Sequence, residues 1–262
     1  MRRVIAAFPT LLRIAVAEMV AYRAEMIIWI LTSTLPLVML ALWNAAAANG
    51  PLAGFGQAEL ARYFAVTLLV RQLTGAWVMW ELNHQIRTGS LSPALLRPMH
   101  PLWWAFAETL AAIPWRVLVL VPVLAAVAAW RPELLFVPSL AQALGFVVSL
   151  VLALLISWYV QCFFGCLAFW FDQSVGLFQV WFFLWAVFGG YVVPLGLLPD
   201  AWAAAAAWLP FHASIGAPVE VLLGLTPIGP TLAIQAGWAA LFAAGFQVLW
   251  QRGIRRYGAV GA

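Results

Sequence analysis

The 262-residue sequence contains no lysine, few charged residues of either sign and only two cysteines. Charged residues make up 8% of the chain and hydrophobic residues 66%, whereas soluble domains contain about 25% charged and roughly 45–50% apolar residues. So few polar side chains cannot cover the surface of a water-soluble globule. The same composition excludes a disordered chain, a nucleic-acid-binding domain and a secreted disulfide scaffold. The sequence therefore predicts an integral membrane protein.

The absence of lysine also restricts the chemistry. A phosphate-binding loop of the GxxxxGK[ST] type needs a lysine on the phosphates, so this chain cannot hydrolyse ATP with such a loop. A lysine Schiff base with a pyridoxal or retinal cofactor is excluded for the same reason. The sequence also shows no arrangement typical of a serine–histidine–aspartate triad or of paired catalytic carboxylates. We therefore expect no catalytic residue and no cofactor in this chain.

The cysteines and histidines suggest neither a disulfide nor a metal site. Cys162 and Cys166 are four residues apart in an apolar run, so they share one helix face and a helix cannot join them. We interpret them as small packing residues. His84, His100 and His212 are far apart in the sequence, which is not the spacing of a metal-binding cluster.

Six apolar stretches are long enough to cross a bilayer, which needs about 20 mostly apolar residues per helix. The expected spans are residues 27–48, 63–80, 104–130, 140–169, 175–193 and 231–250. Only Asp172 interrupts the apolar sequence between the fourth and fifth spans, so the turn there must be short. We expect one all-α transmembrane domain with six transmembrane helices over residues 1–262.

The arginines are divided unequally between the two sides of this predicted domain. With six spans both termini share one side, which holds nine arginines, whereas the other side holds two. By the positive-inside rule, the termini and the loop after the second span lie in the cytoplasm. We therefore expect a multi-pass protein of the cytoplasmic (inner) membrane. The nine arginines are Arg2, Arg3, Arg13, Arg23, Arg87, Arg97, Arg252, Arg255 and Arg256.

Residues 1–25 have the pattern of an amphipathic helix. Phe8, Leu11 and Met19 share one face at 100° per residue, and charged residues including Arg13 and Glu18 cluster opposite. These charges interrupt what would have to be the continuous apolar core of a cleavable signal peptide. We expect an interfacial helix on the cytoplasmic leaflet; the alternative is a loosely ordered tail.

The segment 194–230 is apolar and rich in proline. It holds six of the 16 prolines, and so many prolines would interrupt a single spanning helix. The segment is also too hydrophobic for an ordinary aqueous loop. We expect a re-entrant hairpin of two short helices in the outer leaflet. The alternative is a seventh span over residues 201–225, which would place the arginine-rich C-terminal tail outside.

The end of the fifth span combines flexible and rigid residues. Gly189 and Gly190 precede Tyr191 and Pro194, and glycine tolerates backbone conformations that other residues avoid. We hypothesise that these residues form a hinge and an outer gate where the chain enters the hairpin. The aromatic run of this span either lines a conduit for a lipid-like substrate or packs in the bundle.

The cytoplasmic segment after the second span predicts a short helix. Gly89 ends the preceding helix, Leu91, Leu95 and Leu96 give the next one an apolar side, and Pro98 stops it. A short helix that shows apolar residues to the cytoplasm needs a partner. The alternative is a connector that follows the membrane surface.

Three charged residues are expected within or near the ends of spans. Arg71 and Arg116 lie near the middle of the second and third spans, and Glu108 lies near one end of the third. A charge at the bilayer centre costs about 2.5–3.5 kcal/mol on insertion scales, so such residues usually face the bundle interior or a cavity. The two arginines either line a substrate path and attract an anionic group, or one of them pairs with Glu108 inside the bundle.

The chain resembles the permease subunits of ABC-2 type transporters, particularly the compact six-span branch that pairs with a separately encoded ATPase. The resemblance depends on three features in the same order: the amphipathic helix over 1–25, the segment 88–98 and the proline-rich hairpin over 194–230. In segment 88–98 the residues match the loose pattern G-x-L-x₃-L-L-R-P, which lies where family members carry the coupling helix that docks on the ATPase.

The resemblance implies a non-catalytic subunit of an exporter for an amphiphilic or lipid-like substrate. MgATP would bind to a partner P-loop ATPase, and the permease would pair with a second copy or a paralogous permease, surrounded by membrane lipid. The alternative function is an ATP-independent secondary carrier or an intramembrane enzyme. The residues that the resemblance assigns to ATPase coupling are Arg87, Gly89, Leu91, Leu95, Leu96, Arg97 and Pro98.

Overall fold

The computed structural model describes residues 2–22, 28, 35–130 and 135–257, and within these ranges the chain is helical and contains no strand. Short 3₁₀ turns occur at η1 (Ala47–Asn49), η3 (Leu167–Phe169) and η4 (Leu195–Leu197). The described helices are α1 (Arg2–Ala21), α3 (Leu35–Ala46), α4 (Gln57–Thr74), α5 (Val78–Thr88), α6 (Leu91–Leu95), α7 (Leu102–Trp130), α8 (Leu140–Cys166), α9 (Ser174–Phe188), α10 (Asp200–Ala207), α11 (Pro210–Ser214), α12 (Gly216–Leu223) and α13 (Ile228–Tyr257).

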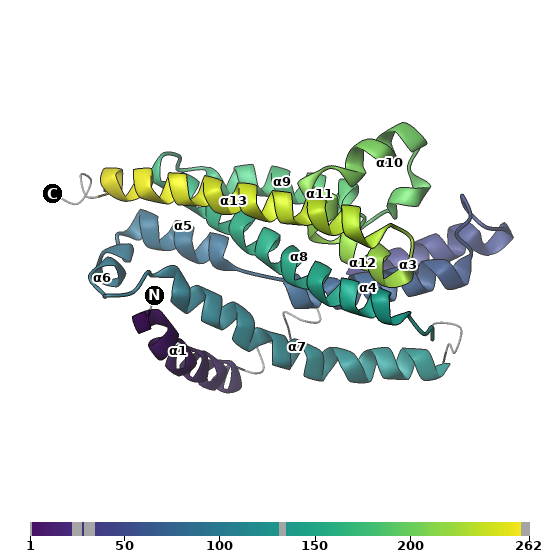
Figure 1. The fold of residues 1–262 in the computed structure, drawn as a ribbon, viewed down its shortest axis with the longest axis horizontal. Coiled ribbons are helices and arrows are strands. Elements are labelled where there is room, and N and C mark those ends of the chain that lie inside the picture. Colours follow the sequence, from purple (N-terminus) through teal and green to yellow (C-terminus); the bar gives the residue numbers. More distant parts are fainter. Residues whose placement is uncertain (1, 23–27, 29–34, 131–134, 258–262) are drawn as a thin grey trace.

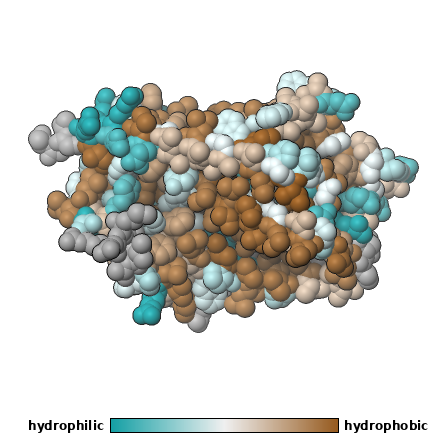
Figure 2. Space-filling model, in the orientation of Figure 1, coloured by the Kyte–Doolittle hydropathy of each residue, from teal (hydrophilic) through white to brown (hydrophobic). Residues whose placement is uncertain are grey.

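Three long helices, α7, α8 and α13, extend along the length of the molecule (Figure 1). Helix α8 occupies the centre, where it packs against α13, α5, α12 and α4. Each of the three is long and apolar enough to cross a membrane, and α3 with η1 and α9 form shorter apolar helices. Hydrophilic residues gather near the two ends of the molecule and hydrophobic residues cover much of the surface between them (Figure 2). The all-helical membrane class is confirmed.

The helices match several of the expected spans closely. Helix α7 and the combination of α8 with η3 begin and end within two residues of the third and fourth spans. Helix α9 ends at Phe188, five residues before the expected end of the fifth span, because the chain turns at Gly189 and Gly190. Helix α13 continues seven residues past the expected end of the sixth. Most of the first span before Leu35 lies outside the described residues.

The second expected span is not one helix. Residues 63–80 are divided between α4 and α5, with Gly75, Ala76 and Trp77 in a non-helical connection. Gly75 has an extended backbone conformation (φ −68°, ψ 129°), which ends the helical hydrogen-bonding pattern. Hydropathy alone predicts a continuous helix here because the residues on both sides of the break are apolar.

Helix α1 lies beside the first half of α7 (Figure 1). Ala15 is completely buried in a small cluster with Ala107 and Ala111, and the Phe8 ring contacts Trp103 edge to face with centroids 5.9 Å apart. The helix continues through Pro9. The amphipathic helix is therefore present, and its position on a membrane surface stays a prediction.

The proline-rich segment forms three short helices, α10, α11 and α12, where the sequence predicts two. The continuous helix considered over residues 201–225 is not formed, because the chain leaves helical conformation at Leu209 and Ile215. Helices α11 and α12 are largely buried against α4, α8, α9 and α13. The buried Gln235 amide of α13 donates to the backbone oxygens of Ser149 (3.1 Å) and Ala213 (2.8 Å), which ties α11 to α8.

Candidate functional site

The break between α4 and α5 leaves backbone carbonyls without helical partners inside an apolar bundle. Such groups must be satisfied by protein or by water in a cavity, because lipid tails offer no hydrogen bonds. Arg116 of α7 supplies two of the bonds: its Nη1 donates to the carbonyl oxygens of Gln72 (2.9 Å) and Gly75 (2.7 Å). The arginine side chain thus holds the broken helix in place, a role that the sequence does not reveal.

The other side of the break is held by Gln161 of α8. Its Nε2 donates to the carbonyl oxygen of Ala76 at 2.7 Å, and its Oε1 accepts from the backbone N–H of Met79 at 3.4 Å. Gln161 is 8% exposed in an otherwise apolar stretch of α8. The single amide side chain in the apolar run YVQCFF was the sequence signal for this contact, and the sequence analysis did not identify it. Cys162, next to it, and Cys166 are buried free thiols within the core.

Arg71, in the last turn of α4, brings a second positive charge to the break. Its guanidinium carbon lies 5.5 Å from the centroid of the Trp185 ring, which is a cation–π distance, and the group also interacts with the Tyr191 hydroxyl. A Cβ placed on Gly75 would lie 3.2 Å from Nη1 of Arg71 and 3.1 Å from Nη1 of Arg116. The two guanidinium groups therefore flank Gly75, and among the described residues neither forms an ion pair.

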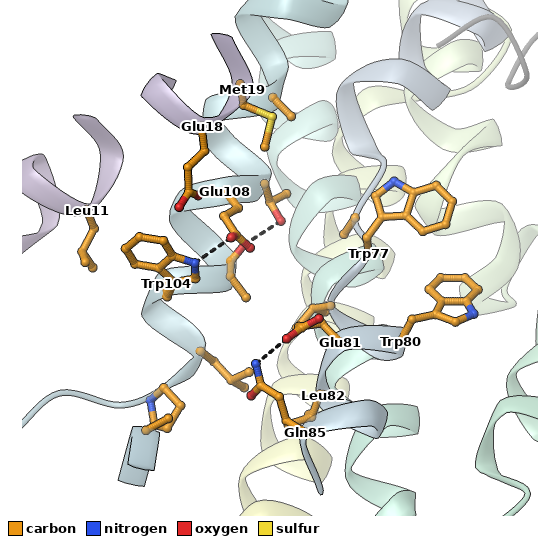
Figure 3. Close-up of a pocket in the computed structure, with 18 of the residues that line it drawn as sticks. Leu11, Glu18, Met19, Trp77, Trp80, Glu81, Leu82, Gln85, Trp104 and Glu108 are labelled. Atoms are coloured by element: carbon orange, nitrogen blue, oxygen red, sulfur yellow. Dashed lines mark hydrogen bonds between the residues drawn. The ribbon is translucent and has the colours of Figure 1, made fainter. Parts of the chain in front are cut away.

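A cavity of about 950 Å³ extends from this arginine pair to the segment around α6. Its walls come from α1, α5 and α7. The Trp104 side chain lies on this side beside Glu108, whereas the rings of Trp77 and Trp80 point to the other side of α5 (Figure 3). Ser90, Pro93 and Arg97 line the other end. The cavity therefore connects the predicted coupling segment with the break in the second span.

Three carboxylates from three helices also line this cavity. Glu18 of α1, Glu81 of α5 and Glu108 of α7 are all labelled in Figure 3, and Glu108 interacts electrostatically with the other two. Trp104 Nε1 donates to Oε1 of Glu108 at 2.6 Å, and Gln85 Nε2 donates to Oε1 of Glu81 at 2.6 Å. Sequence reasoning singled out Glu108 alone, because Glu18 and Glu81 fall outside the expected spans.

A second, smaller cavity of about 60 Å³ continues on the other side of the break. It shares Arg71, Ala76 and Trp77 with the large cavity, and it extends to Trp185 of α9 and Ser214 of α11. The Trp185 indole donates to the Ser214 hydroxyl at 2.9 Å. Arg71 thus stands between a cavity that extends to α6 and one that extends to the proline-rich segment.

The structure separates the leucines of the coupling segment. Gly89 ends α5 with a positive φ of 79°, and the five-residue α6 follows as predicted. Leu91 is completely buried and Leu95 is half-buried against the core, whereas Leu96 is 88% exposed. Of the three leucines expected to form an apolar side, only Leu96 is therefore exposed. Pro98 is also exposed.

Two contacts join the end of α5 and α6 to distant parts of the chain. Arg87 Nη1 donates to the backbone oxygen of Asp172 at 3.3 Å, in the short turn between α8 and α9. The hydroxyls of Ser92 and Tyr257 are 3.2 Å apart, so the last residue of α13 contacts α6. Tyr257 lies beyond the expected end of the sixth span, and sequence reasoning assigned it no role.

The residues of the expected outer gate are closely packed. The Tyr63 hydroxyl donates to the carbonyl oxygen of Gly190 at 2.8 Å, and Gly190 has a positive φ of 86°. Tyr191 and Pro194 are buried. Gly189 lies against the backbone oxygens of neighbouring segments, where a Cβ would collide. The hinge stays a hypothesis. In this conformation Gly189 has no room for a Cβ, and Gly190 has a positive φ that favours glycine.

His100, just before α7, makes stability depend on pH. Its ring lies 4.5 Å from that of Trp250, and burial lowers its pKa from the usual 6.5. As the pH falls, His100 binds its proton at a higher pH in the unfolded state than in the folded state. The free energy of unfolding is therefore highest above about pH 6.5 and decreases below it. We expect the unfolding temperature to fall from pH 7.5 to 5.5, and to fall less in His100→Phe. An identical pH dependence in both proteins would contradict this.

Comparison with known families gives one match. The family model described as ABC-2 family transporter protein covers residues 28–261, which is nearly the whole chain. Comparison with curated proteins and with solved structures gives no match. The long apolar helices agree with the family, whose members are generally non-catalytic membrane subunits that associate with an ATPase. The chain therefore belongs to the ABC-2 transporter family and is a membrane permease of that type.

Proposed function

We propose that this chain is the permease subunit of an ATP-driven exporter in the inner membrane, with both termini and α6 in the cytoplasm. MgATP is bound and hydrolysed by a separate P-loop ATPase, and a second copy or a paralogous permease completes the transporter. The cargo is an amphiphilic or lipid-like molecule. The observation that carries this proposal is the cavity of about 950 Å³ that extends from α6 to the arginine pair.

The contacts of α6 support a route from the ATPase to the cavity. Helix α6 follows α5 directly through Gly89, and α5 provides Trp80 and Glu81 to the cavity wall. Movement of α6 by the ATPase would therefore also move α5, which forms one wall of the cavity. The break at Gly75 lets α5 move relative to α4, because no continuous helical hydrogen bonds connect them. Movement of α5 would then change access between the two cavities that meet at Arg71.

The exposed Leu96 allows a direct test of the ATPase partner. We expect wild-type protein purified from native membranes in mild detergent to bring a P-loop ATPase with it, and Leu96→Glu to lose most of it. A charge on the one exposed leucine of the coupling segment would disrupt an apolar contact without disturbing the core. Co-purification measured by mass spectrometry checks this.

A matched control is Val137→Glu. Val137 is 97% exposed and lies in the connection between α7 and α8, at the opposite end of those helices from α6. This variant should retain the ATPase. If the wild-type chain purifies alone, the ATP-driven function is overturned and an ion-coupled carrier becomes the favoured function. Equal loss of the ATPase from both variants would instead remove the assignment of Leu96.

A further inference from the structure

Within the described part of the chain, the arginine pair has no counter-charge of the kind that buried arginines usually have. Arg116 is 6% exposed and interacts electrostatically with Arg71, so two positive charges lie together in the bundle. Among the described residues no carboxylate lies within ion-pair distance of either guanidinium. Glu108 interacts with Glu18 and Glu81 instead. Like charges brought together without a counter-ion favour the binding of an anion between or beside them.

The available N–H groups suit a carboxylate or a phosphate. Nη1 of Arg116 is occupied by the carbonyls of Gln72 and Gly75, whereas its Nε and Nη2 form no hydrogen bond within the described part of the chain. Arg71 is held by the Trp185 ring and also lines the cavity. Planar guanidinium groups bind carboxylate and phosphate oxygens through paired hydrogen bonds.

The rest of the cavity suits the apolar body of the same molecule. Its volume of about 950 Å³ lies at the upper end of the range for small-molecule pockets, about 300–1,000 Å³. Leu11, Met19 and Trp104 give it apolar surface. The carboxylates of Glu81 and Glu108 would repel a second negative group on the ligand. A single anionic head at the arginine end fits this distribution of charge.

We propose that Arg71 and Arg116 bind the anionic head group, a carboxylate or a phosphate, of the amphiphile that this permease transports. This assignment rests on the permease function proposed above and names the chemical class of its substrate. The head group would occupy the point where the two cavities meet. It would therefore be held beside the break between α4 and α5, where movement of α5 can release it.

The test uses the full-length protein in phosphatidylcholine nanodiscs and three radiolabelled probes of equal chain length: dodecanoate, dodecyl phosphate and dodecanol. Binding is measured with empty nanodiscs subtracted. We expect saturable binding of at least one anionic probe and a loss of at least tenfold in affinity in Arg71→Gln. Arg71→Lys, which keeps the charge, should lose less. Binding of only dodecanoate, only dodecyl phosphate or both supports the proposal and distinguishes a carboxylic acid from a phosphorylated lipid as the source.

Two controls keep the outcome interpretable. Dodecanol binding and the unfolding temperature of Arg71→Gln should remain close to wild type, which shows that the cavity is still formed. Equal affinity of wild type and Arg71→Gln for both anions, or tighter binding of dodecyltrimethylammonium than of either anion, would overturn the proposal. Retained co-purification of the ATPase in Arg71→Gln would leave the permease function standing even then.

Discussion

Replacing Arg116 with alanine is expected to destabilise the protein strongly. The carbonyls of Gln72 and Gly75 would lose their donor, and each buried group left unsatisfied costs about 1–3 kcal/mol. Removing a buried charge offsets part of this loss, so we expect a net destabilisation of at least about 2 kcal/mol. Thermal unfolding of the purified protein in detergent, together with its level in the membrane, measures the effect.

The neighbouring arginine provides the contrast. Arg71 donates to no backbone carbonyl among the described residues, so Arg71→Ala should keep most of the stability that Arg116→Ala loses. Arg116→Lys keeps one charged donor and should recover part of the loss. If Arg116→Ala unfolds at the wild-type temperature, the break between α4 and α5 does not depend on this side chain.

Hydropathy predicts the long helices well because burial in lipid is determined by composition over about 20 residues. Helix α7 and the α8–η3 combination correspond closely to the apolar runs that begin at Trp104 and Leu140. The short helix α6 was also predictable, because Gly89 and Pro98 mark its ends and glycine is favoured where φ is positive. Local sequence signals decide these features.

The candidate site depends instead on contacts between distant residues. The break at Gly75 is stabilised by Arg116, 41 residues away, and by Gln161, which bonds a carbonyl 85 residues away. A sequence window over 63–80 contains neither partner. The two arginines could be identified as charges within apolar spans. Their proximity across Gly75 could not be predicted, because it is a contact between distant parts of the sequence.

The direction of side chains on very short elements is equally hard to predict. Leu95 and Leu96 are adjacent in the sequence and equally apolar, yet Leu95 packs on the core and Leu96 points away from it. Periodicity needs several turns to define a helix face, and α6 has only five residues. The orientation of α6 also involves a distant residue, since Ser92 contacts Tyr257 at the end of α13.

The second large effect is expected at Gly190. Its φ of 86° lies in the left-handed region, where a side chain costs roughly 1–2 kcal/mol, and a Cβ there would collide with the Tyr63 hydroxyl. The hydrogen bond from Tyr63 to the Gly190 carbonyl would be distorted as well, at a further cost of about 1 kcal/mol. We therefore expect Gly190→Ala to lower stability by about 2–4 kcal/mol, measured by thermal unfolding.

Two glycines separate the causes of this effect. Gly54 also has a positive φ, 87°, but nothing lies within 4 Å of the position of its Cβ, so Gly54→Ala tests backbone strain alone and should cost about 1–2 kcal/mol. Gly176, near the start of α9, has neither a positive φ nor a close neighbour, and Gly176→Ala should be neutral or stabilising. Suppose that Gly190→Ala lowers stability no more than Gly54→Ala does. The Tyr63 side chain then moves aside at little cost, and the turn after α9 is loose enough to serve as the hinge into the proline-rich segment.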